Sequence, residues 1–141
     1  MYVLDASIFS SIIIKDEFYD KAEKFLVEHF RDGNITLDLV IIEVANVLWK
    51  HTYILNRIPY EKYFTLKGNI KPLIFSSANV YNSMDFLDEA MDNSIKLGIT
   101  IYDSLYVTVA LSRNSKIVTF DDTLKSKLVE KGLKDVIYQL Q

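Results

Sequence analysis

Three aspartates stand where an apolar segment that predicts a β-strand gives way to a helix: Asp5, Asp103 and Asp121. The carboxyl ends of the strands in an open parallel sheet lie along one edge, so these side chains are expected to meet although they are distant in sequence. Carboxylates gathered there would repel one another unless cations lay among them. Oxygen donors without cysteine suit Mg²⁺ or Mn²⁺ rather than zinc. The three aspartates therefore predict a divalent-metal site.

Glu43 is the fourth candidate ligand. It lies in residues 39–55, where the spacing of apolar residues predicts a long helix, and Val40 and Val44 flank it on the side expected to face inward. This helix begins just after the predicted strand 35–37, so its first turns lie near the same sheet edge. An acid at the border of an apolar face needs a partner, because an unpaired buried carboxylate is costly.

Each acid also has an ordinary structural interpretation. Asp is a favoured helix cap, and Asp5, Asp103 and either Asp121 or Asp122 stand where a cap belongs. Glu43 could instead be a half-exposed residue or a salt-bridge partner within its own helix. The metal site is favoured because these are the only acids that we can place together at one sheet edge.

The elements that position these acids follow from the spacing of the apolar residues. Strands are predicted at residues 2–4, 35–37, 79–81, 116–119 and 136–140, with a short extended segment at 99–101. Helices are predicted at residues 7–14, 18–31, 39–55, 59–75, 83–97 (capped by Ser83), 103–112 (central and buried) and 123–131. This alternation predicts an α/β fold, a three-layer sandwich with a central, mainly parallel sheet flanked by helices, as a single domain over residues 1–141.

The composition excludes several classes of protein. The chain has 141 residues, half of them hydrophobic, as expected for one folded domain. It has no cysteine, which excludes disulfides, thiolate zinc sites and a cysteine nucleophile. We expect a cytoplasmic protein with no membrane contact, because there is no basic leader and no apolar segment long enough to cross a bilayer.

The net charge of −3 runs against the basic character usual for nucleic-acid binders. Two bound divalent cations would offset about four of the acidic charges, at the place where a phosphate must lie.

The ordered acidic motifs resemble those of PIN domains, most closely the VapC-type toxins of bacterial and archaeal toxin–antitoxin pairs. The resemblance rests on DAS at 5–7, Glu43 in IIEVANVL, Asp103 in YDSLYVTVA, and Thr119 with Asp121 in VTFDD. It covers the whole chain, and the segment YDSLYVTVALSRNSKIVTFDD is its most specific part.

The resemblance implies a parallel sheet between helices and Mg²⁺- or Mn²⁺-dependent cleavage of RNA. It also implies a cognate antitoxin that blocks the site, and a homodimer. Asp5, Glu43 and Asp103 match the first three acids of the family.

Asp121 matches the fourth acid, with Asp122 as an alternative ligand or a helix cap. Ser7 and Thr119 match small polar positions that orient ligands or water. Turn and cap hydrogen bonds are an equally good account of these two residues.

Other residues have weaker signals. The RNA strand would need basic side chains, for which a solvated surface position is the alternative: Lys15, Lys50, Arg57, Lys62, Lys67 and Arg113. An aromatic-rich stretch could pack in the core, stack on bases, form a dimer interface or bind an antitoxin segment: Trp49, Tyr53, Tyr60, Tyr63 and Phe64. His29 and His51 are interpreted as surface or structural residues.

Two other functions remain as alternatives. One is an inactive PIN-like interaction domain that binds metal or RNA without cleavage. The other is a phosphohydrolase that forms an aspartyl-phosphate at Asp5, which is disfavoured because Ser7 stands where that chemistry needs an acid.

Overall fold

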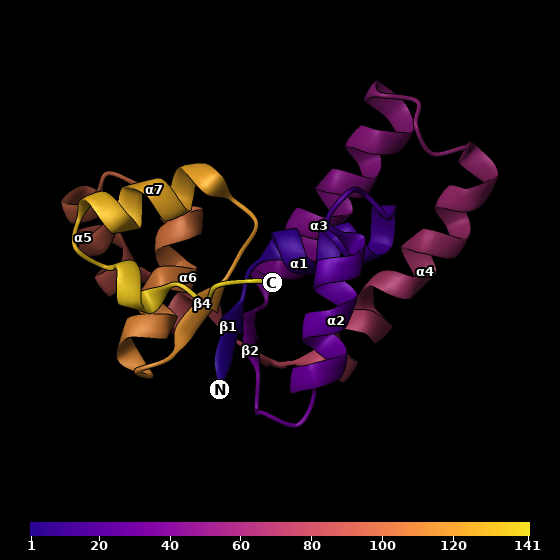
Figure 1. The fold of residues 1–141 in the computed structure, drawn as a ribbon. Helices are drawn as coiled ribbons and strands as arrows, with labels where there is room; N and C mark the ends of the chain where they lie inside the picture. Colours follow the sequence, from indigo (N-terminus) through magenta and orange to yellow (C-terminus); the bar gives the residue numbers. More distant parts are fainter.

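A computed structural model describes residues 1–141 and contains a parallel four-stranded sheet between two layers of helices (Figure 1). The strands are β1 (Tyr2–Leu4), β2 (Ile35–Leu37), β3 (Asn79–Tyr81) and β4 (Lys116–Val118). Their order is β3-β2-β1-β4, and each neighbouring pair is parallel. The predicted three-layer α/β architecture is confirmed.

The helices divide between the two sides of the sheet (Figure 1). One side carries α1 (Ala6–Ile14), α2 (Tyr19–His29), α3 (Leu39–Trp49) and α4 (Tyr60–Ser77). The other side carries α5 (Leu87–Leu97), α6 (Ile101–Ser112) and α7 (Asp122–Glu130). Three short segments complete the chain: the π-helical turn η1 (Lys50–Ile54) and the 3₁₀ turns η2 (Ser83–Phe86) and η3 (Lys134–Val136).

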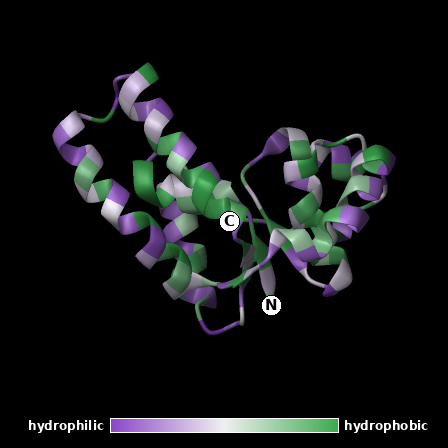
Figure 2. Cartoon of the chain, turned by 180° about the vertical axis from the view of Figure 1, so that it is seen from behind, coloured by the Kyte–Doolittle hydropathy of each residue, from purple (hydrophilic) through white to green (hydrophobic).

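Helices cover both faces of the sheet (Figure 1), and the hydrophobic core lies between the helices and the sheet. Residues of the central strands, such as Val3 and Ile35, are completely buried, as parallel strands usually are. In α6 every residue from Ser104 to Ala110 is buried, which confirms the expected central helix. The hairpin of α3 and α4 extends away from the sheet (Figure 1), and hydrophilic and hydrophobic residues alternate along it (Figure 2), as they do in helices with one solvated face.

The prediction of one α-helix over residues 39–55 was only partly right. The α-helix ends at Trp49, and the chain continues as the π-helical turn η1. The π-turn takes more residues per turn than an α-helix, a difference that the spacing of apolar residues does not reveal. Such turns are rare and occur often at functional sites.

The extended segment predicted at 99–101 was only partly right: Thr100 has an extended backbone (φ −65°, ψ 158°), but no strand forms and Ile101 already begins α6. Gly98 ends α5 with a left-handed backbone (φ 66°), and Thr100 already caps α6, its hydroxyl accepting the Asp103 N–H at 3.2 Å. Asp103 therefore lies in the first turn of α6 and is neither a cap nor a residue that follows a strand. The β-branched residues here suit a strand only where a neighbouring strand is available.

Two smaller predictions also need correction. The last strand, expected at 136–140, is reduced to one isolated parallel bridge between Ile117 and Ile137. The residue that caps η2 is Asn82, whose side chain accepts the Met84 N–H at 2.9 Å, while Ser83 bonds instead to Asp38.

No single helix is long and apolar enough to cross a membrane, and one bent pair, Ser83–Leu97 with Ile101–Ser112, passes on length and composition only.

Candidate active site

The strand order places a pocket beside β1 and β4. The chain runs from β1 to β2 and β3 on one side, while β4 pairs with the other side of β1. In open α/β sheets this reversal of strand order opens a crevice outside the carboxyl ends of the strands. A pocket of about 480 Å³ has the four predicted acids in its lining: Asp5, Glu43, Asp103 and Asp121.

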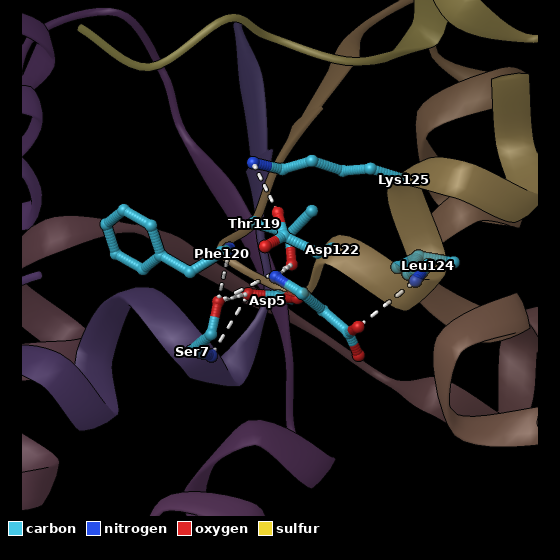
Figure 3. A network of polar contacts seen from close by, with 8 residues as sticks. Asp5, Ser7, Thr119, Phe120, Asp122, Leu124 and Lys125 are labelled. Atoms are coloured by element: carbon cyan, nitrogen blue, oxygen red, sulfur yellow. Dashed lines mark hydrogen bonds and ion pairs between the residues drawn. The ribbon is translucent and has the colours of Figure 1, made fainter.

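Asp5 is buried and caps α1. Its Oδ1 accepts the backbone N–H of Ser7 at 3.0 Å and the Ser7 hydroxyl at 2.6 Å. The Ser7 Oγ in turn accepts the backbone N–H of Phe120 at 2.9 Å (Figure 3). Ser7 therefore joins the junction after β1 to the junction after β4.

Thr119 stabilises the junction that follows β4. It is fully buried, and its Oγ1 accepts the Asp121 N–H at 3.0 Å and lies 3.5 Å from the Ser7 Oγ. Turn bonding is thus a demonstrated contribution of both Ser7 and Thr119, and it sets the position of the two aspartates beside them.

The placement of Asp121 and Asp122 favours Asp121 as the fourth site residue. Asp121 lines the pocket and also caps α7, its Oδ1 accepting the Leu124 N–H at 3.1 Å. The Asp122 side chain is 95% exposed and lies 3.9 Å from the Lys125 ammonium, outside the pocket (Figure 3).

Glu43 has a partner that the sequence did not reveal. The hydroxyl of Tyr106, which is only 2% exposed, donates to the Glu43 Oε1 at 2.7 Å. Glu43 belongs to α3 and Tyr106 to α6, so this bond connects the two helical layers across the pocket. Its one sequence signal was that Tyr106 lies three residues after Asp103, on the same helix face.

Burial and the charges of neighbouring acids raise the pKa values of Asp5, Glu43 and Asp103. Burial raises the pKa of Asp5 to about 6, against the opposing hydrogen bonds of Ser7 and Thr119. Burial also raises the pKa of Glu43 to about 7, and the charges of Asp5 and Asp103 add to the shift. Ionising Asp5 or Glu43 in the folded, metal-free protein therefore costs free energy.

No Lys or Arg side chain forms an ion pair that would offset the negative charge of the four pocket acids. Burial raises the pKa of Asp103, and the nearby charge of Asp121 adds to it. The ion pairs of the protein are His29–Asp32 and Lys125–Asp122, so none of the four pocket acids has a cationic partner. A bound cation would relieve this repulsion.

The donor set suits a hard cation, although the arrangement is not a closed cage. No group of three or more acidic or histidine side chains is arranged to hold one metal ion. Mg²⁺ usually binds proteins through one or two carboxylates and keeps several of its waters. Pairs of pocket carboxylates therefore fit such an ion chemically.

The pocket lining has polar residues besides the four acids, and one of them was interpreted differently from the sequence. They include Asn46, His51 and Asp16, and the Ser11 hydroxyl donates to Asp16 at 3.1 Å. His51 was interpreted as a surface or structural residue, but it is a pocket residue. Its signal was a spacing of eight residues from Glu43, about two helical turns along one face.

His29 keeps its structural interpretation. Its ring packs edge-on against Tyr2 with 4.9 Å between the centroids and also contacts Phe25 and Tyr138. Its Nδ1 lies 2.6 Å from Asp32.

A parallel sheet between helices, with four acids around one pocket at its carboxyl edge, defines the class of protein. The model of the PIN domain family matches residues 2–127, and the chain belongs to this family. Ribonuclease VapC3 of Pyrobaculum aerophilum is 31% identical over 127 residues, which cover 89% of this chain and 92% of that protein. Exonuclease VapC9 of the same organism is 31% identical over 135 residues, covering 96% of this chain and 90% of that protein.

Solved structures agree with this assignment. The crystal structure of PAE2754 from Pyrobaculum aerophilum has a TM-score of 0.66 and 29% identity, and the match covers 89% of this chain and 78% of that one. VapC20 of Mycobacterium tuberculosis, described as a Sarcin-Ricin loop cleaving toxin, also has a TM-score of 0.66, covering 89% of this chain and 94% of that one. Its identity is 14%, so this second likeness concerns the fold alone.

Proposed function

We propose that this protein is a metal-dependent endoribonuclease and the toxin of a VapC-type toxin–antitoxin pair. The observation that carries the proposal is the pocket itself: four carboxylates from four separate elements line it, and none has a cationic partner. The related proteins named as a ribonuclease and an exonuclease support nuclease chemistry on this pocket.

In this proposal Asp5, Glu43, Asp103 and Asp121 hold one or two Mg²⁺ or Mn²⁺ ions and act as the catalytic carboxylates. A bound divalent cation would supply activation of the attacking water and stabilisation of charge on the phosphate oxygens. No protein nucleophile is required.

The chain's own groups orient these carboxylates. Ser7 holds Asp5 through two hydrogen bonds, and the Tyr106 hydroxyl occupies one oxygen of Glu43, leaving the other oxygen free to act as a ligand. The backbone of α7 fixes Asp121 through its Oδ1. Preorganised ligands of this kind lose little freedom when a cation and substrate bind.

The direct test is cleavage of a circular single-stranded RNA by purified protein in Mg²⁺, in Mn²⁺ and in EDTA. An endonuclease linearises the circle, whereas an exonuclease leaves it intact, a distinction that matters because one relative is named an exonuclease. Asp103→Asn should abolish cleavage, and Asp92→Asn, a matched change at an exposed position of α5, should not. Full activity of Asp103→Asn, with contaminating nuclease excluded, would overturn the proposal.

The alternative of an inactive interaction domain has a different signature. Such a protein would bind Mn²⁺ with no cleavage of any RNA, and its biological effect would survive Asp103→Asn.

The proposal includes the partners expected of a VapC-type toxin: a cognate antitoxin that blocks the pocket and a second copy of the chain. Co-purification with the product of an adjacent small reading frame tests the first, and light scattering of the purified protein tests the second. Action on cellular RNA also places the protein in the cytoplasm, which fractionation of cells would check.

A further inference from the structure

His51, a residue of the pocket lining, lies near two cations, Arg57 and Lys50, and near one acid, Asp16. Burial lowers the His51 pKa, and the charges of Arg57 and Lys50 add to that shift. Asp5 and Glu43 line the same pocket, and neither forms an ion pair with a Lys or Arg side chain. Cations therefore lie near His51, whereas none forms an ion pair with the four acids of the same pocket.

Backbone hydrogen bonds hold Arg57 beside His51. The backbone carbonyl of His51 accepts two N–H groups, from Arg57 at 2.9 Å and from Ile58 at 3.2 Å. The chain after η1 thus folds back onto His51 and fixes the backbone of Arg57 next to the pocket.

A second hollow adjoins the pocket at Ile14. It has a volume of about 630 Å³ and lies between α1 and α4, and Ile14 lines both hollows. Its charged lining consists of Lys15, Arg57 and Lys62, without any acidic side chain. We call this hollow the basic groove.

An RNA strand carries a negative charge on every phosphate, so it needs cations both at the acids and along the basic groove. The scissile phosphate can approach the acids only with bound cations, but the neighbouring phosphates need protein cations of their own. Lysine and arginine side chains are the usual phosphate ligands, and the arginine fork can bind two oxygens at once.

We propose, resting on the ribonuclease function above, that the RNA strand runs from the carboxylates past His51 into the basic groove. Lys15, Arg57 and Lys62 bind the phosphates that flank the scissile one on that side. His51 forms a neutral hydrogen bond to the nucleotide between them. The apolar part of the lining, such as Ile13 and Leu66, would also suit a peptide, but three cations without an acid favour RNA.

The test is binding of a short fluorescein-labelled oligouridylate to the Asp103→Asn protein, measured by anisotropy over a range of salt concentrations. Arg57→Gln and Lys62→Gln should each weaken binding about three- to tenfold at low salt. Each should also reduce the slope of log affinity against log salt by about 0.7, the value for one lost contact to a single strand. His51→Gln should weaken binding without changing the slope, because the contact is neutral.

Lys96→Gln is the matched control, since it removes the same charge from α5, which lies on the other side of the sheet. Arg57 and Lys62 are exposed, so their variants should melt at the temperature of the parent. The inference is overturned if Arg57→Gln and Lys62→Gln bind RNA with the affinity and slope of Lys96→Gln. It is also overturned if they keep RNA binding but lose binding to a protein partner.

Failure of the proposed function would look different. Cleavage of circular RNA by the unchanged protein tests the nuclease separately. If the protein binds the oligouridylate through the basic groove and cuts nothing, the strand path stands and the nuclease proposal fails.

Discussion

Asp5 serves two purposes that oppose each other energetically. Its carboxylate caps α1 through the Ser7 N–H, which stabilises the fold. Its burial raises the pKa to about 6, so the charged form that a cation requires is costly in the metal-free protein. A site residue of this kind is expected to reduce stability while it supports function.

Asp5→Asn should therefore abolish RNA cleavage and stabilise the metal-free protein at pH 7.5. Asparagine keeps an oxygen that can accept from Ser7 and removes the ionisation, whose shift from 3.8 to about 6 corresponds to at most about 3 kcal/mol. Urea unfolding in EDTA would show a higher midpoint than that of the parent. A lower midpoint, with Asp92→Asn unchanged, would contradict the argument.

Tyr106 acts on the site through Glu43. Tyr106→Phe should keep the fold and weaken Mn²⁺ binding about tenfold, as loss of a supporting hydrogen bond to a ligand usually does. Titration calorimetry measures the affinity directly. Tyr138→Phe is the control, because its hydroxyl lies 3.4 Å from His29, outside the pocket lining. Equal affinities for both variants would show that Tyr106 does not position Glu43.

At the scale of elements, the site depends on two strand-to-helix junctions, on the first turn of α6, which carries Asp103, and on the second turn of α3, which carries Glu43. Ser7 joins the junction of β1 and α1 to that of β4 and α7 (Figure 3). The sheet edge is thus a connected unit rather than a set of independent loops.

Ser7→Ala should destabilise the protein by about 1–3 kcal/mol, because the Phe120 N–H loses its acceptor and Asp5 loses a donor. Amide hydrogen exchange at Phe120 should accelerate more than exchange in the middle of α6. Ser126→Ala, on the exposed surface of α7, should change neither quantity. Unaltered exchange at Phe120 would mean that the hydrogen bond adds nothing to the junction.

At the scale of the whole molecule, the acids make stability depend on pH and on divalent cations. The folded-state pKa values of Asp5 and Glu43 lie above their ordinary values, so the folded protein holds protons that the unfolded chain has released. The contribution of these groups to stability is present at low pH and is lost as pH rises.

The unfolding free energy of the metal-free protein, relative to that of an Asp5→Asn, Glu43→Gln double variant, should fall between about pH 4 and pH 7 and then level off. The window follows from the ordinary values of 3.8 and 4.5 and the raised values of about 6 and about 7. Mg²⁺ should restore part of the loss at pH 7.5 in the parent and not in the double variant. Parallel pH profiles for the two proteins would show that ionisation of Asp5 and Glu43 does not cause the loss of stability.

Much of the fold and of the site was predictable because the signals are local. Apolar runs and helical spacing indicate β1, β2, β3, β4 and all seven α-helices, and the order of the acidic motifs indicates which carboxylates line the pocket. The failures at 99–101 and 136–140 have one cause: short apolar segments become strands only where a neighbouring strand is available along their length.

The four acids themselves, Asp5, Glu43, Asp103 and Asp121, could be selected from the sequence, together with the sheet edge on which they meet. Only the tertiary structure showed that Asp121 rather than Asp122 lines the pocket, that Tyr106 holds Glu43 from 63 residues away, and that His51 lines the same pocket. These features arise where helices from opposite layers pack together. Side-chain direction and long-range contacts depend on that packing, and local sequence patterns do not encode it.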